Sequence, residues 1–241
     1  KDTTSYSFDY EHRLKSISRS DSATTFVYDG RGTRLQVTHN SVVTRYIYDA
    51  RGNLIAETDS NNTITKYYIY GSGLLAMLTP EGETYTYHYN GLGSTIAMTD
   101  ENKSVVNKYS YTPFGLINNQ EETLAQPFKY AGKYGIMLEG NGFYYMRARY
   151  YDPEVGRFIS EDPLGFEGGD VNLYAYCRNN PINLIDPFGL EPGGKGGKTW
   201  WEKEFGSKEA YEKWTEDEAI QPLPIWEDPI FWSALGGVVV W

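Results

Sequence analysis

Cysteine and histidine are scarce in this chain of 241 residues, which contains one Cys and three His. The single cysteine, Cys177, excludes an internal disulfide bond. No cysteine and histidine residues have the spacing of metal ligands, and we expect neither a metal nor another cofactor. All three histidines lie far upstream of Cys177, so the sequence offers no base to activate this thiol and we do not expect a cysteine nucleophile.

Positive charge and long apolar runs are also limited. Lys and Arg number 22 against 32 Asp and Glu, a formal net charge of −10, which disfavours non-specific binding of nucleic acid. The only long apolar run, Phe231 to Trp241, is too short to cross a bilayer by itself. It is either the start of a longer membrane segment or an apolar plug. No signal peptide opens the chain, and we expect it to be part of a longer protein.

Tyrosine and glycine are abundant, with 22 and 25 residues, a mixture typical of short strands joined by tight turns. An aromatic residue followed by Asp or another small polar residue recurs about every 20 residues, which indicates a repeat architecture. The recurring pairs are Phe8-Asp9, Tyr28-Asp29, Tyr48-Asp49, Tyr70-Gly71, Tyr89-Asn90 and Tyr111-Thr112.

Each repeat has room for two strands and two turns. The stretches 44–48 and 84–89 alternate as half-buried strands do, and glycine or asparagine supplies the positive φ of a tight hairpin turn. One hairpin cannot bury its apolar face, so we expect neighbouring hairpins to continue one sheet. We expect a polar surface loop over 118–126 and further strands over 127–133 and 142–151. The repeated tyrosines could bind a ligand, but we favour packing on one face with the hydroxyl bonded to a neighbouring strand.

Residues 149–190 are the most distinctive stretch, with two Asp-Pro-x-Gly sequences at 162–165 and 186–189. Proline presets φ and glycine accepts positive φ, so each predicts a turn that the aspartate caps. Two aspartates are also the minimum set for acid–base hydrolysis of an amide, because two neighbouring carboxylates do not both ionise easily and one keeps its proton.

This stretch resembles the closing signature of the Rhs/YD-repeat family, the RHS repeat-associated core. The matching residues are Arg149-Tyr150-Tyr151-Asp152-Pro153, Gly156-Arg157-Phe158, Asp162 to Gly165, Gly168-Gly169, Asn172 to Tyr176, Asn180-Pro181 and Asp186 to Leu190. The resemblance implies an all-β fold, in which a ribbon of YD-repeat hairpins spirals into a hollow shell that the core domain closes. We expect the repeat shell over 1–130, the core over 131–190, and a linker with the start of an effector over 191–241, a short mixed or irregular extension.

The resemblance also implies a function. Many members of the family cut their own chain just after the last leucine of this signature, here between Leu190 and Glu191. The chain beyond the cut is a variable effector, usually a toxin. The expected catalytic pair is Asp162 and Asp186. Arg178 is the candidate that orients a carboxylate or steadies the oxyanion.

Alternatives remain for two of these roles. Arg157 competes with Arg178, and Asp152 could replace Asp162. The segment from Gly169 to Asn172, which includes Asp170, is longer than the family usually has, and this bears on the orientation of Asp162.

The first hypothesis is therefore the C-terminal part of an Rhs-type polymorphic toxin, secreted or delivered from a bacterial cell, whose shell holds its own toxin region and binds no nucleic acid. A secretion-system spike or adaptor and a cognate immunity protein are partners that the resemblance implies. The alternatives are a non-enzymatic cell-surface adhesion or carbohydrate-binding protein, and a shell that has kept the motif but lost cutting.

The composition changes after Leu190. Residues 191–198 read as a flexible linker, 207–220 as a short amphipathic helix, and the apolar end leaves open that the effector region meets a membrane. No catalytic constellation identifies the activity of the effector.

Overall fold

The computed structural model describes residues 4–190 and 192–194, and within them the predicted all-β fold is confirmed. The first twelve strands form one antiparallel sheet in which each strand pairs with its neighbours in sequence. These strands are β1 (Ser5–Phe8), β2 (Leu14–Ser18), β3 (Ala23–Tyr28), β4 (Arg34–His39), β5 (Val42–Tyr48), β6 (Leu54–Thr58), β7 (Ile64–Gly71), β8 (Gly73–Leu78), β9 (Thr84–Tyr89), β10 (Thr95–Thr99), β11 (Val105–Tyr111) and β12 (Ile117–Glu122).

In four of the six recurring aromatic–polar pairs (the YD pairs), the Asp or Asn builds the turn after it. Asp29 Oδ1 accepts hydrogen bonds from the backbone N–H groups of Arg31 and Thr33, at 2.9 and 2.8 Å. Gly32 has a φ of 86°, which glycine adopts without steric cost. The pattern recurs at the turns after Asp9, Asp49, Asp59 and Asn90. The repeat in the sequence is therefore a repeat of capped hairpin turns.

The tyrosine of several pairs ties one hairpin to the one before it. The hydroxyls of Tyr28, Tyr89 and Tyr111 donate to the carbonyls of Leu14, Leu74 and Thr95, at 2.9, 2.8 and 2.7 Å. This confirms the structural role that we favoured for these three tyrosines. The hydroxyls of Tyr48 and Tyr70 are buried and have no hydrogen-bond partner within the described part of the chain.

Two local predictions after the repeats were wrong. The polar stretch 118–126 was predicted as a loop, but residues 118–122 belong to β12, which pairs with β11 from Asn107↔Glu122 to Tyr111↔Ile117; residues 123–126 lie outside any strand. This strand is the last of the sheet and is largely exposed, so it carries no apolar alternation. The stretch 127–133, predicted as a strand, is coil leading into a short 3-10 helix, η1 (Gly132–Tyr134). The stretch 142–151 contains two strands.

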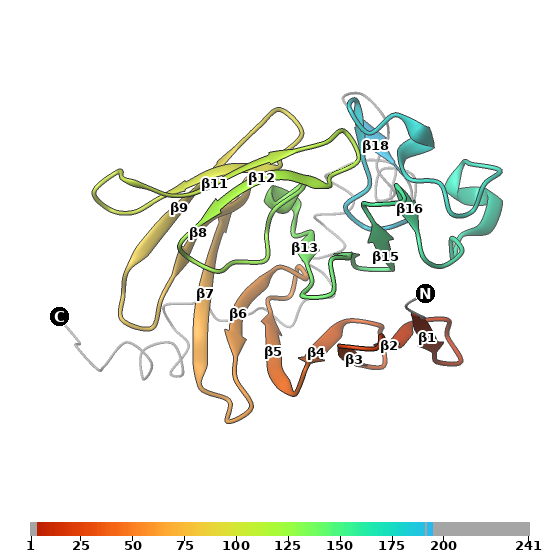
Figure 1. The fold of residues 1–241 in the computed structure, drawn as a ribbon, viewed down its shortest axis with the longest axis horizontal. Helices are drawn as coiled ribbons and strands as arrows, with labels where there is room; N and C mark the ends of the chain where they lie inside the picture. Colours follow the sequence, from red (N-terminus) through yellow and green to blue (C-terminus); the bar gives the residue numbers. More distant parts are fainter. Residues whose placement is uncertain (1–3, 191, 195–241) are drawn as a thin grey trace.

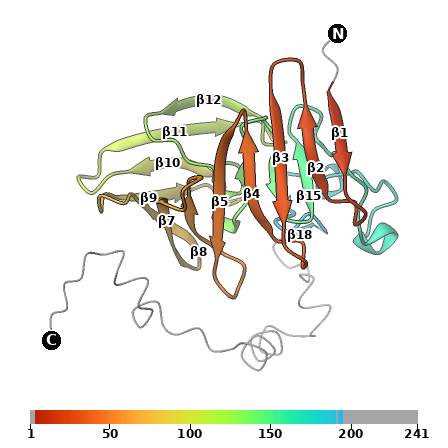
Figure 2. The same cartoon turned by 90° about the horizontal axis from the view of Figure 1, so that it is seen from below.

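The chain after β12 adds η1, short strands and two further short helices. A second sheet contains β13 (Met137–Leu138), β14 (Tyr144–Met146), β15 (Arg149–Asp152) and β16 (Arg157–Phe158), and two more short helices come after it, η2 (Gly165–Gly168) and η3 (Cys177–Asn179). The large sheet curves, and β13 to β15 lie on the inner side of its bend (Figures 1 and 2).

One hydrophobic core joins the two sheets. Phe26 of β3 meets Tyr150 of β15 with ring centroids 4.8 Å apart, and Tyr68 of β7 meets Phe128 at 4.9 Å. Leu74, Met77 and Met98 are fully buried in the same cluster. The predicted linker and effector region, including Glu191, the helix over 207–220 and the apolar end, lies outside the described residues apart from 192–194.

Candidate active site at the second aspartate turn

Both Asp-Pro-x-Gly sequences form the predicted turns. The N–H of Gly165 donates to the carbonyl of Asp162 at 2.9 Å, and the N–H of Gly189 donates to that of Asp186 at 3.4 Å. The two glycines have φ values of 57° and 66°. In the first turn, Asp162 Oδ1 also accepts the N–H of Leu164 at 2.9 Å. The turns therefore fix the backbone of both aspartates.

The structure brings Asp162 and Asp186 together around one guanidinium nitrogen. Nη2 of Arg149, on β15, lies 2.9 Å from Asp162 Oδ2 and 3.4 Å from Asp186 Oδ2. The side chains of Arg149, Asp162 and Asp186 are 3%, 8% and 1% exposed, so the cluster is almost closed to solvent. One cation with two buried carboxylates favours a state in which the pair shares a proton.

Burial sets the protonation of this pair. Removal from water raises the pKa of Asp186 to about 6, the negative charge of Asp162 acts in the same direction, and Arg149 opposes both. Burial also lowers the pKa of Arg149, while the two aspartates counteract that shift. Because the groups interact strongly, the proton belongs to the pair rather than to one carboxylate.

Leu190 lies within reach of both aspartates. Its N–H donates to Asp186 Oδ1 at 3.1 Å. Its carbonyl oxygen borders Gly168 together with Asp162 Oδ2: a Cβ added to Gly168 would lie 3.0 Å from the first and 2.6 Å from the second. The carbonyl of Leu190 thus borders the same small space as Asp162 Oδ2, while the N–H of Leu190 is bonded to Asp186.

The backbone around Leu190 is held from several sides. Nε of Arg149 donates to the carbonyl of Gly189 at 2.5 Å, and Nη1 donates to that of Leu173 at 3.0 Å. After the turn the chain folds back, and β17 (Leu184–Ile185) pairs with β18 (Gly193–Gly194). Leu190 therefore lies between two strands that pair with each other.

Arg178 does not join this cluster. Its side chain is exposed, and its guanidinium lies against Gly169, where an added Cβ would be 2.6 Å from Nη2. Within the part of the chain that the structure describes, it forms no ion pair with Asp162 or Asp186. Arg157 is exposed too and contacts Asn172 and the ring of Tyr174. The cation between the aspartates is Arg149.

Asp152 serves its own turn rather than the site, because its Oδ1 accepts the N–H groups of Glu154 and Val155 at 2.9 and 3.3 Å. Asp170 likewise accepts the N–H of Asn172 at 2.9 Å. Cys177 is 1% exposed, and burial raises the pKa of its thiol above the ordinary value, so it stays protonated. None of these side chains replaces Asp162.

One sequence signal could have identified Arg149. It stands among tyrosines in a stretch that reads as a buried strand, and a cation in such a place needs an anionic partner. The described residues contain no group of three or more His, Cys, Asp or Glu side chains that could hold a metal ion. They also contain no helix that is long and apolar enough to span a membrane.

Comparison with known proteins places the chain in a family. The teneurin YD-shell family model matches residues 3–182. The chain is 40% identical over 196 residues to the tRNA3(Ser)-specific nuclease WapA of Bacillus spizizenii, covering 76% of this chain and 8% of that protein. It is 52% identical over 66 residues to toxin protein Tse5 of Pseudomonas aeruginosa, covering 27% of this chain and 5% of Tse5. The chain therefore spans only a small part of these relatives.

The fold has a solved counterpart. The crystal structure of TcdB2-TccC3 superposes with a TM-score of 0.63 at 21% identity, over 78% of this chain and 10% of that one. At this identity the likeness concerns the fold alone. The family match over the repeats and the core, together with this shared fold, shows that the chain belongs to the teneurin YD-shell family, the β-shell family to which its Rhs-like signature pointed.

Proposed function

We propose that this chain is the C-terminal part of the β-shell of an Rhs-type polymorphic toxin, and that Arg149, Asp162 and Asp186 cut the peptide bond between Leu190 and Glu191. The observation that carries the proposal is the position of Leu190, whose N–H is bonded to Asp186 and whose carbonyl borders Gly168 beside Asp162. In this scheme residues 1–130 are shell, 131–190 are the core and 191–241 begin the effector.

The reaction is a hydrolysis in which the aspartate pair moves two protons. A water oxygen bonds to the Leu190 carbonyl carbon while the ionised Asp162 takes a proton from that water. Asp186, which carries the shared proton, donates it to the carbonyl oxygen, and a gem-diol forms. The C–N bond then breaks as Asp162 passes its proton to the departing nitrogen of Glu191, and one hydroxyl of the gem-diol returns its proton to Asp186 as the carbonyl re-forms. The products are a carboxyl group on Leu190 and an amino group on Glu191.

Arg149 contributes electrostatics and positioning. Its charge keeps one carboxylate ionised in a buried place, and its bond to the Gly189 carbonyl holds the residue before Leu190. Because the substrate is part of the same chain, no binding step is needed and the effective concentration is high. The reaction happens once per molecule.

The toxin assignment rests on the relatives, since proteins named as toxins or nucleases match this chain in Bacillus, Pseudomonas and Yersinia. In the proposal the protein is secreted or delivered from a bacterial cell, and the shell keeps its toxin region apart until delivery. A spike or adaptor and an immunity protein are its proposed partners. The adhesin alternative has less support, because the hydroxyls of Tyr28, Tyr89 and Tyr111 are engaged inside the sheet.

The test is the intact mass, under denaturing conditions, of the parent chain and of Asp186→Asn, each expressed at full natural length. We expect two species that meet at Leu190 and Glu191 in the parent and one uncut species in the variant. Asp170→Asn is the matched control, since this aspartate caps a turn outside the cluster, and it should cut like the parent. An uncut parent, or an Asp186→Asn chain cut at the same bond, would contradict the proposal.

A further inference from the structure

We propose that Arg147 is a positioning residue for self-cleavage: it links the loop that carries Leu190 to η1, which sits on the repeat sheet, so that cutting depends on the sheet having formed around the core. This inference rests on the proposed self-cleavage. Arg147 acts through the backbone of the loop, by way of the carbonyl of Pro187.

Arg147 holds the loop directly before the cleavage site. Its Nη1 donates to the carbonyl of Pro187 at 2.6 Å, and its guanidinium carbon lies 4.5 Å from the centre of the Phe188 ring. The next residue adds a third contact, because the N–H of Ala148 donates to the carbonyl of Phe188 at 3.1 Å. Pro187 and Phe188 lie between Asp186 and Leu190, so these contacts set the path of the chain from the catalytic carboxylate to the reacting carbonyl.

Two arginines of one turn thus hydrogen-bond to the backbone of the loop 187–189. Arg147 and Arg149 stand at either end of the tight connection between β14 and β15. Arg147 binds the carbonyl of Pro187, and Arg149 binds that of Gly189. Arg149 also contacts both aspartates, whereas Arg147 reaches the repeat side of the molecule.

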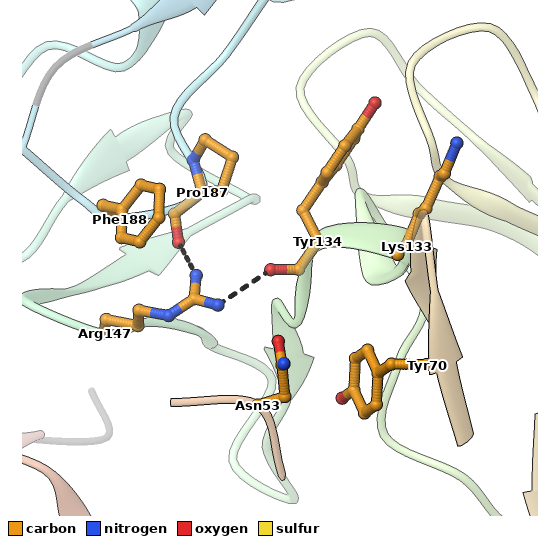
Figure 3. Close-up of a pocket in the computed structure, with 8 residues that line it drawn as sticks. Asn53, Tyr70, Lys133, Tyr134, Arg147, Pro187 and Phe188 are labelled. Atoms are coloured by element: carbon orange, nitrogen blue, oxygen red, sulfur yellow. Dashed lines mark hydrogen bonds between the residues drawn. The ribbon is translucent and has the colours of Figure 1, made fainter. Parts of the chain in front are cut away.

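The other side of Arg147 faces η1. Its Nη2 donates to the carbonyl of Tyr134 at 3.1 Å, so a single guanidinium bridges Tyr134 and Pro187 (Figure 3). Arg147 has a φ of 53°, a left-handed conformation that is unfavourable for a residue with a side chain. Such a conformation persists only where surrounding contacts determine it, and it occurs preferentially at functional sites.

The helix η1 is itself seated on the repeat sheet. The N–H of Lys133 donates to the carbonyl of Gly93 at 3.0 Å, in the turn between β9 and β10. Gly73 and Gly93, with φ values of 102° and 78°, leave the space that η1 occupies. A Cβ at Gly73 would lie 2.7 Å from the Lys133 side chain, and one at Gly93 would overlap the Tyr134 ring.

These contacts form one continuous path from the sheet to the reacting peptide. It runs from the turn at Gly93 to Tyr134, then through Arg147 to Pro187, and ends at Leu190. Until β9 and β10 have paired, the turn at Gly93 that binds η1 is not formed, and the loop that carries Leu190 lacks the contact through Arg147. Cutting is thereby delayed until the shell wall is in place, which prevents early separation of the effector region.

The experiment uses the chain at full natural length, diluted from denaturant while uncut, with the cut fraction followed by mass. We expect Arg147→Gln to slow cutting about 10- to 100-fold, the usual effect of a small misplacement of reacting groups. Arg31→Gln, an exposed arginine of a repeat turn, is the matched control and should cut like the parent. Free guanidinium at non-denaturing concentration should restore cutting in Arg147→Ala, a result that general loss of structure would not produce.

Gly93→Ala tests the distant end of the path. We expect it to slow cutting too, and we expect the double variant with Arg147→Gln to be slowed by less than the product of the two single effects, because both break one path. Thermal unfolding of each change in an Asp186→Asn background shows whether the fold is retained independently of cutting.

Distinct outcomes separate this inference from the proposed function. A parent chain that stays whole overturns both. A parent that cuts, with Arg147→Gln cutting at the same rate, overturns the role of Arg147 and leaves the catalytic cluster standing. Slow cutting that guanidinium does not restore, or single effects that multiply in the double variant, also overturns the proposed path.

Discussion

The proposed self-cleavage should depend on pH through the proton that Asp162 and Asp186 share. The proposed reaction needs one ionised and one protonated carboxylate, and burial raises the pKa of Asp186 to about 6 from an ordinary value of 3.8. That shift corresponds to about 3 kcal/mol against ionisation in the folded chain. A raised pKa means that the proton is present at low pH and is lost as the pH rises through about 6.

The expected magnitude is the fraction of molecules that keep this proton. About half keep it at pH 6 and about one in a hundred at pH 8, so the cutting rate should fall about 50-fold between these values. The assay dilutes the unfolded, uncut chain into buffers from about pH 5 to pH 9 and measures the cut fraction by mass at successive times. Folding of the Asp186→Asn chain, followed by fluorescence at each pH, gives the folding rate for comparison.

Two results would refute this reasoning. One is a cutting rate that is constant or rises between pH 6 and pH 8 while folding is faster than cutting. The other is a fall that matches the pH dependence of folding in the Asp186→Asn chain, since folding would then account for the whole profile.

Two further predictions concern the frame of the site. Gly189→Ala should abolish cutting, because its added Cβ would lie 2.5 Å from the Met146 carbonyl. Gly52→Ala has open space and a similar positive φ, so it should lower the free energy of unfolding by only about 1 kcal/mol and still cut. Equal cutting by both variants, measured by intact mass, would contradict this. Arg34 forms a fully buried ion pair with Glu139, at 2.5 Å, so in an Asp186→Asn background Arg34→Met should lower the free energy of unfolding by about 3 kcal/mol at pH 8. The loss should be smaller at pH 5, because burial raises the pKa of Glu139 and the unpaired carboxyl can then take up a proton. Chemical denaturation gives the free energy of unfolding at both pH values. The exposed ion pair of Lys108 with Glu121 serves as the control, and its loss should lower the free energy of unfolding by less than about 1 kcal/mol. For Arg34→Met, an equal or larger loss at pH 5 than at pH 8 would contradict the prediction.

Local rules in the sequence predicted most of the fold. The spacing of the YD pairs, the capping aspartates and the glycines of positive φ each act within a few residues, so the repeat of hairpins could be derived from the amino-acid sequence. The same rules failed at β12, an exposed edge strand without apolar alternation, and at 127–133, where burial against β7 and β9 replaces strand pairing.

The candidate site divides in the same way. The sequence by itself determined the two aspartate turns and, through family resemblance, the pair Asp162 and Asp186 with Leu190 as the expected cleavage position. Only the tertiary structure decided which cation lies between the aspartates. Arg149, Asp162 and Asp186 come from β15 and two separate turns, and their distances depend on how those elements pack rather than on their spacing. The same holds for Arg147, whose two partners come from η1 and from the loop of Leu190.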